Sequence, residues 1–207
     1  AAFVRGRLPD APQLPNAELI EYGRAQGLRV HKFKRAIELP RVRKVLGALH
    51  SLYPNTLLDI GSGRGVFLWA LLDTFPNLPV TALDQAAQRV GDLEAVHWGG
   101  VERLTAVQGD VTQLEFAAGE FEGVTILEVL EHLPEPLAGA VEVLRVCSSF
   151  VVASVPSQPD DNPEHLHLFT AETLTQLFQT AAEQLEIRIS VRCEYVLNHL
   201  IAVVLRR

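Results

Sequence analysis

The stretch LLDIGSGRG, at residues 57–65, is a short apolar run that ends in three closely spaced glycines. Such a run predicts a buried strand, and the glycines predict a tight turn at which a helix begins. Glycine tolerates positive φ and has no side chain, so a ligand can lie directly against the backbone N–H groups of the turn. The N-terminus of the following helix also favours an anionic group there. This stretch therefore predicts a ligand-binding loop at the end of a strand.

Strand-like and helix-like segments alternate along the chain from residue 40 onward. We expect strands at 56–60, 80–83, 104–108, 124–127 and 150–155, and helices from Pro40 and at 66–75, 85–97, 136–146 and 170–184. The last two strand-like runs, 186–196 and 200–205, are too close for a helical crossover and should pair antiparallel. The pattern predicts an α/β fold: a Rossmann-like doubly wound sheet, mostly parallel with an antiparallel C-terminal strand and helices on both faces.

The chain divides into an N-terminal arm or lid at residues 1–39 and a ligand-binding domain at residues 40–207. Residues 1–15 contain three prolines and predict a loose arm. The net charge is −7, yet the segment Arg29–Lys44 holds seven of the 18 basic residues and one acid. This segment is either a solvated helix face or a patch that attracts phosphate or RNA.

Acidic residues follow three successive strands of the predicted sheet. Asp59 precedes the glycine turn, Asp84 ends the second strand and Asp110 ends the third. The turn departs from a dinucleotide fingerprint because Val66 stands where the last glycine belongs. A carboxylate beside the turn would repel pyrophosphate, whereas it suits a ligand with an ammonium group. Asp84 can accept both hydroxyls of a ribose, although Asp84 and Asp110 can also be simple turn formers.

These motifs resemble the class I family of methyltransferases that depend on S-adenosylmethionine (SAM), over about residues 40–207. The motifs are LDIGSGRG at 58–65, ALD at 82–84, GDV at 109–111 and ILEVLEHL at 126–133. The resemblance implies that the glycines line the methionine end of SAM, with Asp59 near its amino group. It further implies that Asp84 holds the ribose and Asp110 with Val111 the adenine. The predicted SAM-binding residues are Asp59, Gly61, Ser62, Gly63, Gly65, Asp84, Gln85, Asp110, Val111 and Glu128.

A Glu-x-x-Glu-His motif, formed by Glu128, Glu131 and His132, follows the fourth strand. If the chain turns helical there, all three side chains share one face. With His165, they make a candidate site for Mg²⁺ or Mn²⁺. In the alternative interpretation, Glu131 and His132 only shape a loop over the substrate. A further hypothesis makes Glu128, His132 and His165 catalytic, with His132 or His165 as the general base for an acceptor hydroxyl.

The same motif is similar to two metal-using branches of the family. One branch, Hen1-like, methylates the terminal ribose of small RNAs, and the other methylates ubiquinone-precursor catechols. The chain lacks the aromatic and basic residues that the RNA branch has around its later histidine. The favoured prediction is therefore an enzyme that methylates a small or medium metabolite. The alternatives are an RNA ribose 2′-O-methyltransferase, a non-catalytic SAM-binding module and, last, a nicotinamide-dependent dehydrogenase.

The composition is that of an ordinary globular protein, with 48% hydrophobic and 21% charged residues. The longest apolar stretches fall well short of a membrane span. Cys147 and Cys193 lie in apolar segments and are expected to be free thiols, which predicts a cytoplasmic protein.

Overall fold

A computed structural model describes residues 1–30, 33, 36–159 and 161–207. Its centre is a seven-stranded sheet in the order β3-β2-β1-β4-β5-β7-β6. The strands are β1 (Leu57–Ile60), β2 (Val80–Asp84), β3 (Leu104–Gln108), β4 (Phe121–Leu127), β5 (Cys147–Pro156), β6 (Ile189–Val196) and β7 (His199–Arg206). The first five strands run parallel, and β7 lies antiparallel between β5 and β6. The predicted fold class is confirmed.

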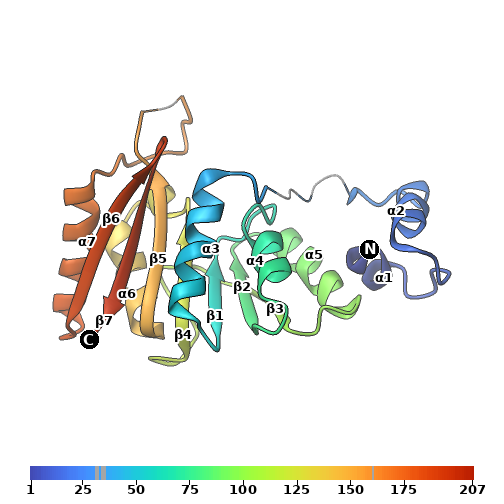
Figure 1. Cartoon of the computed structure of the whole chain (residues 1–207), viewed down its shortest axis with the longest axis horizontal. Helices are drawn as coiled ribbons and strands as arrows, with labels where there is room; N and C mark the ends of the chain where they lie inside the picture. Colours follow the sequence, from blue (N-terminus) through green and yellow to red (C-terminus); the bar gives the residue numbers. More distant parts are fainter. Residues whose placement is uncertain (31–32, 34–35, 160) are drawn as a thin grey trace.

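Helices cover both faces of this sheet (Figure 1). One layer contains α3 (Pro40–Leu52), α4 (Leu68–Thr74) and α5 (Ala87–Trp98), and the other contains α6 (Pro136–Val146) and α7 (Ala171–Gln184). α3 begins at Pro40, whose fixed φ suits the first turn of a helix. α7 begins at a capping box in which the Thr170 side chain accepts a hydrogen bond from the Thr173 N–H.

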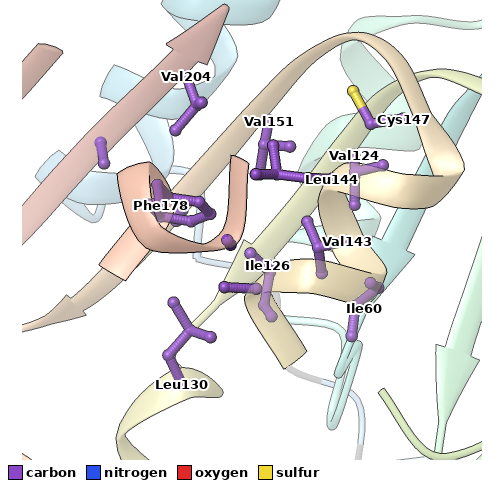
Figure 2. Packing of buried hydrophobic residues seen from close by; sticks show 14 of the residues in the cluster. Ile60, Val124, Ile126, Leu130, Val143, Leu144, Cys147, Val151, Phe178 and Val204 are labelled. Carbon is purple, nitrogen blue, oxygen red and sulfur yellow. The ribbon is translucent and has the colours of Figure 1, made fainter. Parts of the chain in front are cut away.

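The core lies between the sheet and its two helical layers. All four residues of β1 are buried, as expected for a central parallel strand with helices on both faces. Figure 2 shows Val143 and Leu144 of α6 and Phe178 of α7 packed with side chains of the central strands. Cys147 is buried in this cluster and, like Cys193, is not bridged.

The N-terminal arm differs from the prediction, because residues 2–7 form a helix, α1 (Ala2–Arg7), followed by α2 (Asn16–Ala25). α1 packs closely on α5. A Cβ on Gly6 would stand 1.8 Å from the carbonyl oxygen of Ala95, and one on Gly99 equally close to that of Ala2. Arg7 pairs with Asp92 at 3.0 Å.

The order of the strands reverses direction between β1 and β4. These two strands pair with each other in parallel, and β1 also pairs with β2 in parallel. In doubly wound sheets, ligands bind at such a switch point, outside the carboxyl ends of the strands. The predicted site residues lie at or just after the carboxyl ends of β1 to β4, except His165, which lies in the loop after β5. Among the described residues, no helix is long and apolar enough to cross a bilayer.

Candidate functional site

The glycine loop after β1 has the conformation that its sequence requires. Gly61, Gly63 and Gly65 have φ of 72°, 54° and 76°. These left-handed values strongly favour glycine. A Cβ on Gly65 would collide with the Trp69 indole, which donates a hydrogen bond to the carbonyl oxygen of Arg64 at 3.1 Å. Gly65 therefore keeps the loop folded onto α4, whereas Gly61 and Gly63 line cavities.

Asp59 lies beneath this loop and is almost completely buried. Its carboxylate accepts hydrogen bonds from Ser62 Oγ and Thr125 Oγ1, both at 2.8 Å. Burial raises the pKa of Asp59 to about 6, even though the two hydroxyl groups act in the opposite direction. The folded chain therefore favours the protonated form of Asp59, which adds to the stability of the fold at low pH. This added stability is lost as the pH rises through about 6. A cation bound beside Asp59 would favour its ionised form.

Asp84, at the end of β2, joins the glycine loop to the start of α5. Its Oδ2 accepts from the Gly63 N–H and its Oδ1 from the Ala86 N–H, each at 2.9 Å. Arg89 Nη1 lies farther away, 3.4 Å from Oδ2, and the Arg89 side chain is half exposed. A carboxylate offers about four lone-pair positions. The two backbone contacts leave two positions, and Arg89 Nη1 donates a long hydrogen bond to one of them.

Two adjoining cavities follow the carboxyl edge of the sheet. The larger, of about 1000 Å³, is lined by six of the predicted SAM-binding residues: Gly61, Asp84, Gln85, Asp110, Val111 and Glu128. The smaller, of about 230 Å³, is lined by Asp59, Ser62 and Gly63 and again by Gly61 and Glu128. Arg89 lines both. Asp110 also has a local role, because its Oδ1 accepts from the N–H and the hydroxyl of Thr112, both at 2.8 Å.

Glu128 stands apart from the rest of its motif. Its φ of 56° is left-handed, and the short 3₁₀ turn begins after it, at Leu130–His132. The helical turn that would align Glu128 with Glu131 and His132 is therefore not formed. Glu128 instead accepts a hydrogen bond from Ser154 Oγ at 2.6 Å and lies 3.1 Å from His199 Nδ1. Burial would raise the pKa of Glu128, but contacts with His199 and Ser154 and the nearby Arg41 charge lower it overall.

The other three residues of the predicted metal group lie together. Potential ligand atoms of Glu131, His132 and His165 are all within 4.8 Å of one another. The His132 and His165 rings pack edge to face, 4.8 Å apart. The loop at 164–167 is fixed to this turn, because the Leu166 N–H donates to the Glu131 carbonyl at 2.8 Å and His132 Nδ1 lies 2.9 Å from the Glu164 carbonyl.

His199 was not singled out from the sequence as functional, and Arg41 was noted only as part of the basic segment Arg29–Lys44. Arg41, at the start of α3, lines the smaller cavity and lies 3.4 Å from His199 Nε2. Within the basic segment, Lys32, Lys34 and Arg35 lie outside the described residues. Lys44 pairs with Glu194 at 2.6 Å, so this lysine and Arg41 both face other parts of the chain.

Comparison with known proteins shows what this chain is similar to. A family model described as "Methyltransferase domain" matches residues 57–149. A ubiquinone biosynthesis O-methyltransferase of Vibrio parahaemolyticus is 31% identical over 114 residues, which are 54% of this chain and 45% of that protein. The chain thus spans about half the length of the curated relatives it matches.

Solved structures show the same fold at low identity. A SAM-dependent methyltransferase from Aquifex aeolicus superposes with a TM-score of 0.66 at 20% identity, covering 82% of this chain and 91% of that chain. The methyltransferase domain of a bacterial Hen1 superposes with a TM-score of 0.62 at 18% identity. The match covers 80% of this chain and 97% of that chain. The chain thus has the fold of SAM-dependent methyltransferases, and over residues 57–149 its sequence is similar to that of a methyltransferase domain.

Proposed function

We propose that this protein transfers the methyl group of SAM to a hydroxyl group of a small-molecule acceptor. The observation that carries the proposal is the large cavity bounded at once by the glycine loop, by Asp84 and by Asp110. The acceptor class is favoured by the similarity to O-methyltransferases of ubiquinone biosynthesis. The cavity is large enough for the adenosyl group and for part of an acceptor.

The two cavities suit the two ends of SAM. In the proposed arrangement Asp84 accepts from the ribose hydroxyls, and Asp110 and Val111 border the adenine. The methionine tail occupies the smaller cavity, where Arg41 offers a guanidinium for the carboxylate. Asp59 and Glu128 offer carboxylates for the ammonium group. The cavity of about 230 Å³ is lined by these two acids and by three arginines, Arg41, Arg64 and Arg89, so it offers both signs of charge to an amino-acid head group.

Bound SAM would supply a methyl carbon made electrophilic by the sulfonium. The protein's part is to hold the acceptor oxygen in line with that carbon and to exclude water. His132 is placed to take the hydroxyl proton, since it lines the larger cavity. Its Nδ1 faces the Glu164 carbonyl, which can only accept, so the ring proton resides there and the Nε2 lone pair is available.

In an alternative to this base role, Glu131, His132 and His165 would hold a divalent cation, and the Nε2 lone pair of His132 would bind the metal instead of the proton. The fit is favourable because a backbone carbonyl fixes the His132 tautomer, as is usual for metal-bound histidine. Two imidazoles and one carboxylate favour Mn²⁺ over Mg²⁺, which prefers oxygen ligands. Such an ion would lower the pKa of an acceptor hydroxyl. Glu128 contacts Ser154 and His199 instead, and we propose no metal role for it.

Replacement of His165 by alanine tests the metal proposal. We expect Mn²⁺ binding to the wild-type protein, measured by electron paramagnetic resonance, and weakening of at least tenfold in H165A. Turnover should fall on chelation and return with Mn²⁺. His97→Ala is a matched control, because His97 lies on α5 and contacts the Leu104 carbonyl at 2.8 Å. Equal Mn²⁺ binding by the wild type and H165A would contradict the metal site. Glu131 and His132 would then only shape the loop over the substrate.

The pKa of Asp59 predicts a pH dependence of cofactor binding. Protonated Asp59 cannot pair with the ammonium of SAM, so affinity should fall as the pH drops through about 6. Between pH 7 and pH 5 we expect about a tenfold loss, measured by isothermal titration calorimetry. Asp59→Asn should bind more weakly at neutral pH and show a smaller pH effect. An affinity that is flat across this range in the wild type would contradict the role given to Asp59.

The proposed activity is tested by release of S-adenosylhomocysteine with a panel of acceptors. Catechols and other small hydroxyl compounds should be methylated by the wild-type protein. RNA with a free terminal ribose serves as the competing acceptor. Turnover with RNA alone would replace the proposed acceptor class, and tight SAM binding without turnover on any acceptor would favour a binding module.

A further inference from the structure

The smaller cavity is bordered by a chain of contacts that joins three distant elements. Arg41 of α3 contacts His199, the first residue of β7, and His199 contacts Glu128 after β4. Arg41 and Glu128 line the cavity directly. The imidazole of His199, whose side chain is 25% exposed, lies between a cation and an anion.

The contacts fix which atom of the imidazole carries its proton. An arginine side chain has only donors, so Arg41 Nη1, at 3.4 Å, donates to Nε2 of His199. The ring proton of a neutral His199 is then on Nδ1. This buried nitrogen lies 3.1 Å from Glu128 Oε2, at ion-pair distance although not aligned for a hydrogen bond. The ring thus presents its acceptor to the guanidinium and its positive edge to the carboxylate.

This arrangement keeps two opposite charges apart. Arg41 is close enough to lower the pKa of Glu128 by its charge, and the imidazole occupies the space between them. Without it, the guanidinium and the carboxylate could pair directly, as bidentate partners. Such a pair would neutralise the cation and the anion that a zwitterionic ligand needs at separate points.

We propose that His199 is a positioning residue that holds Arg41 and Glu128 apart to receive the amino-acid end of the cofactor. This inference rests on the proposed function, because it assigns the smaller cavity to the methionine tail. It gives His199 a role in selecting ligands with that tail, separate from the nucleoside contacts of Asp84. Ser154, which donates to Glu128 Oε1 at 2.6 Å, holds the other side of the same carboxylate.

Two adenosine ligands separate this role from a general effect on the fold. S-adenosylhomocysteine has the amino-acid tail, whereas 5′-methylthioadenosine has the same nucleoside and a thioether without it. Both are titrated calorimetrically into the wild type, His199→Phe, which roughly keeps the ring volume, and His199→Asn, which keeps a donor near Nδ1. His97→Phe is the matched control on a remote histidine.

We expect His199→Phe to bind S-adenosylhomocysteine about tenfold more weakly and 5′-methylthioadenosine as tightly as the wild type. His199→Asn should show a smaller loss, and His97→Phe none. If His199→Phe weakened the binding of both ligands equally, the role of His199 would be merely structural. If the binding of both ligands were unchanged, this inference would be overturned while the proposed function would stand. A wild-type protein that binds neither ligand would instead contradict the proposed function itself.

Discussion

Replacement of Asp84 by alanine is expected to weaken SAM binding about a hundredfold. Two lone-pair positions of this carboxylate accept backbone N–H groups of Gly63 and Ala86. The ribose hydroxyls would take the other two, one of them by displacing the half-exposed Arg89 side chain from its long contact at 3.4 Å. Hydrogen bonds to a charged group contribute about 1.5 kcal/mol or more each, and two of them amount to about two orders of magnitude in affinity. Isothermal titration calorimetry with SAM measures the loss directly.

Asp92→Ala is the matched control for this experiment. Asp92 is also a buried acid, and it pairs with Arg7 of α1 and is not among the residues that line either cavity. Its removal should lower the melting temperature, because α1 loses a contact, but should leave SAM affinity unchanged. If Asp84→Ala, checked for folding by circular dichroism, bound SAM as tightly as the wild type, the ribose would have to lie elsewhere.

A methyl group added at Gly63 is expected to weaken SAM binding by at least tenfold with only a small effect on stability. A Cβ at this position would meet nothing closer than the Gly61 carbonyl oxygen at 3.6 Å, so the fold has room for it. The left-handed φ of 54° costs alanine about 1–2 kcal/mol. The added methyl would, however, stand in the space between the loop and Arg89, where the proposed cofactor approaches the backbone.

Gly27→Ala separates backbone strain from obstruction of the site. Gly27 has a φ of 84° and would have no atom within 4 Å of an added Cβ, at a position remote from the cavities. Both variants should lower the free energy of unfolding by similar amounts in urea titrations. Only Gly63→Ala should lose SAM affinity. Similar affinities for the two variants would contradict close contact between the cofactor and the loop.

Local patterns were sufficient to predict the parallel sheet and the positions of Asp59, Asp84 and Asp110. An apolar run that ends in glycines, or a strand that ends in an acid, can be recognised from a few neighbouring residues. The parallel topology then brings the carboxyl ends of the strands to one edge of the sheet. The helix predicted from residue 170 was likewise visible in sequence. These features depend on neighbours along the chain, which is why the sequence alone identified them.

The features that the sequence did not reveal depend on contacts between distant segments. α1 is too short to be stable alone, and its close packing on α5 depends on Gly6 and Gly99, far apart in sequence. The contact of Glu128 with His199 likewise joins two distant segments, the residue after β4 and the first residue of β7. The left-handed backbone of Glu128 gave no signal either, since glutamate does not favour it.

A crystal structure with S-adenosylhomocysteine tests the central claim most directly. The account predicts the ribose against Asp84, the adenine beside Asp110 and Val111, and the amino-acid tail between Arg41 and Glu128. A nucleoside bound outside the larger cavity, or a tail pointing away from the smaller one, would contradict it.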